Sequence, residues 1–107
     1  MKYYKYLYIQ DRLEKYKDRI IEKLNKNQIQ LGIHLLVLSG NAKNHLEIID
    51  TRLLLQRSYP KDDFFVVGIA KGYDGALEIL EEIVQKVYNE TGGADIRSYI
   101  LEKERES

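Results

Sequence analysis

The chain has 107 residues, of which 44% are hydrophobic and 32% charged, and its formal net charge is zero. This length suits one domain with one modest core, and the composition is that of a globular protein. The absence of cysteine excludes disulfides, thiolate zinc sites and thiol catalysis. No run approaches the roughly 18 to 20 apolar residues of a membrane span, and Lys5 interrupts the N-terminal apolar stretch. We therefore expect a cytoplasmic protein without a signal peptide or a membrane partner.

Charge is distributed unevenly along the chain. Residues 1–30 carry eight basic and four acidic side chains, whereas residues 74–107 carry four basic and nine acidic ones. The simpler interpretation is two solvated helix faces that attract each other. A basic face for an anionic partner is the alternative, and a chain without net positive charge supports it poorly.

The N-terminal segment has a helical pattern. Apolar side chains recur at spacings of three and four, as in a heptad seam: Tyr6, Ile9, Leu13, Tyr16 and Ile20. This spacing predicts one helix from about residue 4 to residue 26. An alternative stays open, because Asp11 to Glu14 resembles a capping box that would begin the helix at residue 12. Tyr3 to Ile9 would then be free to form a strand.

The predicted N-terminal helix is long enough to make contacts outside the domain. It would span about 34 Å, in a domain whose expected radius of gyration is about 13 Å. Part of its apolar face would overhang the core and need a partner, for which two-fold pairing is the commonest solution. We therefore expect a homodimer contact at Tyr6, Ile9, Leu13 and Tyr16.

The middle of the chain predicts a hairpin. Gln30 to Leu38 and Leu46 to Ile49 have strand composition, and a loop of turn-forming residues separates them. Asp50 can cap a short helical turn over residues 53–55, or the second strand can continue, and the sequence does not decide between the two. The segment 59–63, which holds the only proline, ends this region.

The clearest pattern lies in residues 64–88. An apolar run from Phe64 to Ala70 predicts a buried strand that ends in a glycine-bearing turn. A helix is expected directly after it, with one apolar face: Ala76, Leu77, Leu80, Ile83, Val84, Val87 and Tyr88. Thr91-Gly92-Gly93 would stop this helix, and Ala94 to Leu101 predicts a last strand that completes a right-handed parallel crossover.

Together these elements predict an α/β fold, at the border with α+β, in a single-domain sandwich over residues 1–107. Its mixed sheet would have about four strands, covered by the long N-terminal helix and by a central βαβ crossover helix. The charged residues 102–107 are expected to form a frayed tail.

The turn before the central helix is the best candidate for a ligand site: Lys71, Gly72, Tyr73 and Asp74. Backbone N–H groups at a helix N-terminus, with nearby glycines and a lysine, can hold an anion. However, the turn matches neither the dinucleotide-binding fingerprint nor the phosphate loop. Asp74 would also satisfy the free N–H groups itself and repel a phosphate. A structural role for the turn is therefore the simpler interpretation.

Two histidines, His34 and His45, would lie on neighbouring strands of the hairpin, with Asp50 and Glu47 as the carboxylates that could join them. Their spacing matches neither HxH nor HxxxH, so we expect no metal and no cofactor. No serine lies in a GxSxG context either, so no motif argues for catalysis.

Segment 2–8 mixes two lysines with four tyrosines, as platforms that bind single-stranded nucleic acid mix cations with aromatic side chains. The same side chains can supply core or protein-interface area, where tyrosine is favoured. The neutral chain favours this second interpretation, so a nucleic-acid partner is not expected.

Three stretches resemble a family of small bacterial proteins of unknown function: Leu46 to Asp50, Val66 to Asp74 and Thr91 to Ile100. The resemblance implies no activity and supplies no catalytic residue. The expected function is a non-enzymatic protein-interaction or regulatory module that forms homo-oligomers. The alternatives are a small-ligand or anion-binding domain, or an enzyme, that uses the Gly68–Gly75 turn, and a nucleic-acid-binding accessory protein.

Overall fold

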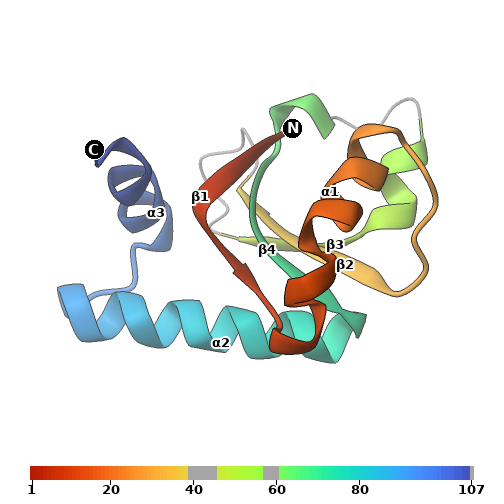
Figure 1. Cartoon of the computed structure of the whole chain (residues 1–107). Helices are drawn as coiled ribbons and strands as arrows, with labels where there is room; N and C mark the ends of the chain where they lie inside the picture. Colours follow the sequence, from red (N-terminus) through yellow and green to blue (C-terminus); the bar gives the residue numbers. More distant parts are fainter. Residues whose placement is uncertain (39–45, 57–60, 107) are drawn as a thin grey trace.

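The computed structural model describes residues 1–38, 46–56 and 61–106 (Figure 1). The elements follow in this order: β1 (Lys2–Ile9), η1 (Asp11–Tyr16), α1 (Lys17–Asn25), β2 (Ile33–Leu38), β3 (Glu47–Asp50), η2 (Thr51–Leu55), η3 (Lys61–Asp63), β4 (Phe65–Lys71), α2 (Gly72–Thr91) and α3 (Ile96–Arg105). The four strands form one sheet in the order β1-β4-β2-β3. Because β1 runs parallel to β4 while the other pairs are antiparallel, the predicted mixed sheet of an α/β fold is confirmed.

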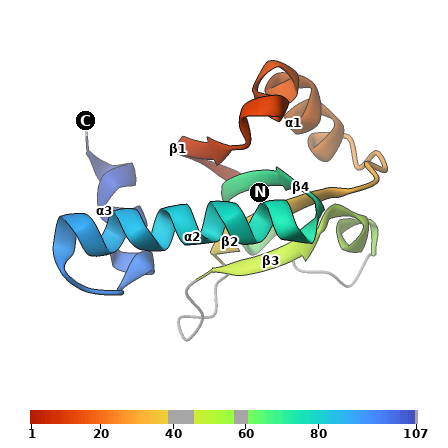
Figure 2. The ribbon, with the colours of Figure 1, turned by 90° about the horizontal axis from the view of Figure 1, so that it is seen from below.

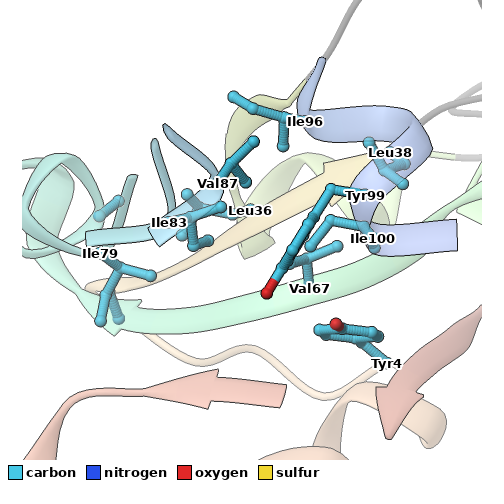
Figure 3. Packing of buried hydrophobic residues seen from close by; sticks show 12 residues of the cluster. Tyr4, Leu36, Leu38, Val67, Ile79, Ile83, Val87, Ile96, Tyr99 and Ile100 are labelled. Atoms are coloured by element: carbon cyan, nitrogen blue, oxygen red, sulfur yellow. The ribbon is translucent and has the colours of Figure 1, made fainter. Parts of the chain in front are cut away.

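The sheet separates two hydrophobic clusters. On one face, α2 and α3 cover a cluster that includes Leu36, Val67 and Ile83 (Figure 3). On the other face, α1 and η1 cover a cluster that includes Leu35, Val66 and Ile69. Figure 2 shows α2 running across the sheet in front of β2. No helix in the described ranges is long and apolar enough to cross a membrane.

The N-terminal segment forms a strand, so the predicted helix over residues 4–26 is wrong and the alternative strand over residues 3–9 is right. Alternate side chains of β1 enter the two clusters, with Tyr4 on the α3 side and Leu7 on the α1 side. Aromatic and apolar residues at this period suit a strand that is covered on both faces. Helical structure begins only at Asp11, as η1 and then α1.

The C-terminal segment forms helix α3, so the predicted last strand and the parallel crossover are wrong. Asp95 caps this helix, because its carboxylate accepts hydrogen bonds from the backbone N–H and the hydroxyl of Ser98 at 3.1 and 2.9 Å. Ile96, Tyr99 and Ile100 follow at helical spacing and are buried. Residues 102–105 continue the helix rather than fraying.

The central elements agree with the sequence. β2 and β3 form the expected antiparallel hairpin, although β2 begins at Ile33 rather than at Gln30. Asp50 caps η2 by accepting a hydrogen bond from the backbone N–H of Arg52 at 3.0 Å. The helix α2 ends at Thr91 and is capped by Gly92, whose φ of 73° is left-handed as predicted. The predicted turn over residues 39–44 lies outside the described residues, as do Tyr59 and Pro60.

The apolar side of α2 is wider than predicted and is only partly covered. The buried residues are Gly75, Ala76, Ile79, Ile83 and Val87. Three members of the predicted face, Leu77, Val84 and Tyr88, are exposed instead. Gly68 allows α2 to approach the sheet closely, since a Cβ at this position would lie 3.1 Å from Cγ2 of Ile79.

Candidate functional site

The turn between β4 and α2 forms part of an open depression of about 650 Å³. The depression brings together all four residues that the sequence singled out, Lys71, Gly72, Tyr73 and Asp74. It is also lined by residues from outside this turn: Gln10, Arg12, Gly75 and Glu78. Sequence reasoning missed Gln10 and Arg12, because only the pairing of β1 with β4 brings them here.

Gln10 fixes the geometry of this turn. Its Oε1 accepts a hydrogen bond from the backbone N–H of Lys71 at 2.6 Å. A Cβ on Gly75 would lie 2.6 Å from Nε2 of Gln10, so only glycine fits there without movement of the Gln10 side chain. Gly72 donates its N–H to the carbonyl of Gly32 at 2.7 Å and has a φ of 74°. These contacts show that the glycines have a structural role.

The charges around the depression balance. Arg12 and Lys71 are positive, whereas Asp74 and Glu78 are negative. Asp74 lies in the first turn of α2, where it interacts favourably with the helix dipole. It does not cap the helix as predicted, since the N-cap is Lys71 and no side chain accepts a capping hydrogen bond. The two carboxylates offset the two cations, so this arrangement does not favour an anionic ligand.

His34 is a half-buried residue of β2. Its Nδ1 lies 3.3 Å from the carbonyl oxygen of Gly32, and its ring lies edge-on to the ring of Tyr73 at 6.4 Å. Asp50 is its cross-strand partner in the hairpin, whereas His45 is outside the described residues. Within the described ranges, no group of three or more histidine and carboxylate side chains is placed to hold a metal ion.

A hydrogen bond and an ion pair join α3 to α2. The hydroxyl of Tyr99 donates a hydrogen bond to Oε2 of Glu90 at 2.5 Å. Nζ of Lys103 lies 3.9 Å from the other carboxylate oxygen and 5.6 Å from the centre of the Tyr99 ring. Burial, followed by the hydrogen bond to Glu90, raises the pKa of Tyr99. Tyr99 is therefore a neutral hydrogen-bond donor near pH 7. Its contact with Glu90 has a structural role, since it holds α3 against α2.

An exposed line of large apolar side chains runs along α2. Its members have substantial exposed fractions: Tyr73 56%, Leu77 36%, Val84 41% and Tyr88 61%. Spacings of four, seven and four residues place them on one side of the helix. We call these four residues the α2 row. The half-buried Leu80 lies between this row and the sheet-facing side.

A second apolar surface lies on the opposite side of the sheet. It is a depression of about 300 Å³ between α1 and the segment before β2. Three cations and two exposed apolar side chains line it: Arg19, Lys23, Lys71, Tyr16 and Leu31. We call these five residues the basic cleft. No carboxylate is among the residues that line this depression.

The cleft is built from contacts that fix its two walls. The buried side chain of Gln30 donates a hydrogen bond from Nε2 to the carbonyl of Ile20 at 3.1 Å. Thr51 donates its hydroxyl to the carbonyl of Gln30 at 3.0 Å. The first bond holds the segment before β2 against α1, and the second holds it against η2. Leu31 in this segment has an exposed fraction of 74%.

The four residues of the predicted dimer contact do not lie on one helix, as the prediction assumed. Two of them belong to β1 and two to η1. Tyr6 is exposed on β1 and Ile9 is half-buried at the end of the same strand. Leu13 is buried in the core, and Tyr16 lines the basic cleft. These residues therefore do not form the continuous seam that the spacing suggested.

Comparison of the chain with protein-family models, with curated proteins and with solved structures finds no match. The resemblance to a family of small bacterial proteins therefore stays an expectation.

Proposed function

We propose that the protein is a non-enzymatic interaction module that binds a second copy of itself through the α2 row. The observation that carries this proposal is the exposure of four large apolar side chains in one line on the longest helix. Contact with a partner would remove this apolar surface from water. Two of the four side chains are tyrosines, which are enriched in the cores of protein interfaces.

The depression at the start of α2 is a weaker candidate for the functional site. Its balanced charges give no preference for an anion, and its glycines are explained by the contacts with Gln10 and Gly32.

A protein partner is also favoured over nucleic acid, because α2 itself carries five acidic side chains and one basic side chain. We place this module in the cytoplasm, where proteins ordinarily have no disulfides.

The test replaces two members of the α2 row with charged residues. We expect Leu77→Asp/Val84→Asp to be monomeric by light scattering at about 100 µM, where the wild type is dimeric or larger. Lys86→Asp changes the net charge by the same two units at an exposed position on the β1 side of the same helix, so it is the matched control and should associate as the wild type does. Circular dichroism should show the same helix content in all three proteins. A wild type that is monomeric at this concentration would contradict the proposal.

A further inference from the structure

We infer that the α2 row of one copy binds the basic cleft of the next, so that copies associate head to tail. This inference rests on the proposed function, because it names the surface of the second copy that the α2 row contacts. Each of the two surfaces combines exposed apolar side chains with a net charge, and the two net charges are opposite in sign.

The α2 row has an acidic border. Asp74, Glu78 and Glu81 lie along its solvent side, at helical spacing from Leu77. All three carboxylates are exposed, and none forms an ion pair within the described part of the chain. The only basic side chain of α2, Lys86, points to the β1 side, where it lines the depression beside Tyr8 and Tyr99. Arg12 and Lys71 line the depression beside Asp74 and Glu78, so the three carboxylates outnumber the two nearby cations and the border keeps a net negative charge.

The basic cleft has the opposite charge. Arg19, Lys23 and Lys71 line it, and no ion pair between described residues involves any of them. Tyr16 and Leu31 supply exposed apolar surface between these cations. Opposite potentials steer two surfaces together and fix their register, while apolar contact supplies the main free energy.

A symmetric contact between two α2 rows is less favourable. A two-fold axis through the middle of the row would pass near Glu81, because the row extends from Tyr73 to Tyr88. The two copies of Glu81 would then face each other, and like charges that approach each other across an interface have a cost. The basic cleft removes this repulsion and pairs the same carboxylates with cations.

The position of the two surfaces determines the kind of assembly. Helix α2, which carries the row, covers one face of the sheet, and helix α1, which lines the basic cleft, covers the other face (Figure 1). A contact between different surfaces leaves one of each kind free in a dimer. Head-to-tail association therefore continues to a closed ring or to an open chain.

The experiment reverses the charge of each surface separately. The acidic-surface variant is Glu78→Lys/Glu81→Lys, and the basic-surface variant is Arg19→Glu/Lys23→Glu. All four positions are outside the core clusters, and circular dichroism would check that each variant folds. Sedimentation velocity then measures each variant alone, an equimolar mixture of the two, and the wild type in about 0.05 M and about 0.5 M salt.

Each variant alone should associate at least about tenfold more weakly than the wild type, because both of its surfaces then carry the same sign of charge. The mixture should form complexes that contain both variants, since each variant supplies the surface that the other lacks. High salt should weaken association of the wild type and of the mixture.

Two results would overturn the head-to-tail arrangement. One is a basic-surface variant that associates as strongly as the wild type, and the other is a mixture that stays monomeric. If Leu77→Asp/Val84→Asp still abolishes association in either case, the α2 row stays the interface and only its partner surface is wrong. A wild type that does not associate at all would instead remove the proposed function together with this inference.

Discussion

The two long sides of α2 are both apolar, but only one of them packs against the sheet. Ile83 and Val84 are neighbours in the sequence, yet Ile83 is fully buried and Val84 has an exposed fraction of 41%. The buried side contacts β4 and β2, which form the middle of the sheet. A four-stranded sheet covers only part of an apolar surface as wide as that of α2. The remaining apolar surface of α2 is available for a partner.

The largest effect is expected on the buried side. Ile83→Ala should lower the free energy of unfolding by about 2–5 kcal/mol, because it removes a fully buried side chain from the cluster between α2 and the sheet. Urea denaturation measures this loss. A loss below about 1 kcal/mol would show that this side of α2 does not form the core.

A smaller loss is expected where α2 approaches β4. Gly68→Ala would place a Cβ 3.0 Å from Cδ1 of Leu36 and 3.1 Å from Cγ2 of Ile79. Both neighbours lie in the packed cluster, so we expect a cost of about 1–3 kcal/mol from overpacking in the same denaturation experiment. An unchanged stability would mean that α2 can move away from the sheet at no cost.

The stabilisation from the hydrogen bond between α2 and α3 should depend on pH. Tyr99→Phe removes the hydrogen bond to Glu90 and should cost about 1 kcal/mol. The pKa of Tyr99 is raised in the folded state, so its contribution is fully present below the unfolded pKa of about 10 and is lost as the pH rises above it. Urea denaturation between pH 8 and about pH 11 should therefore show a steeper loss in the wild type than in Tyr99→Phe. Equal slopes would contradict the raised pKa.

The smallest effect on stability is expected on the exposed side. Val84→Ala should change the free energy of monomer unfolding by no more than about 0.5 kcal/mol, because the side chain has few neighbours to lose and alanine favours helix. Denaturation at low protein concentration measures this change, and light scattering at high concentration should show weaker association. A loss as large as that of Ile83→Ala would mean that the row is part of the core.

The two ends of the chain show why local patterns misled the prediction. Spacings of three and four run through Tyr6, Ile9 and Leu13, but the strand alternation of residues 2–9 overlaps with them. Tertiary structure decides between the two, because β4 offers β1 a parallel edge and both faces of β1 are then covered. Intrinsic propensity is a weak preference that such burial overrides.

At the other end, the sequence did contain a signal for a helix. Asp95 followed by Ser98 is a capping pattern, and Ile96, Tyr99 and Ile100 have helical spacing. A strand was predicted for Ala94 to Leu101 because a strand followed by a helix commonly leads to a second, parallel strand. The rule for parallel connections applies only where a further strand exists, and here α3 packs on α2 and β1 rather than joining the sheet.

By itself, the sequence determined the buried strand β4, the helix α2 with its stop at Gly92, the hairpin and the turn from Lys71 to Asp74. These features depend on short-range patterns of side-chain size, polarity and backbone freedom, which the residues carry locally. Only the tertiary structure decided which side of α2 is buried, that Gln10 holds the turn, and that Arg19, Lys23 and Lys71 share one cleft. Each of these depends on which distant segments become neighbours in the sheet, and that choice is made by the burial of the whole core.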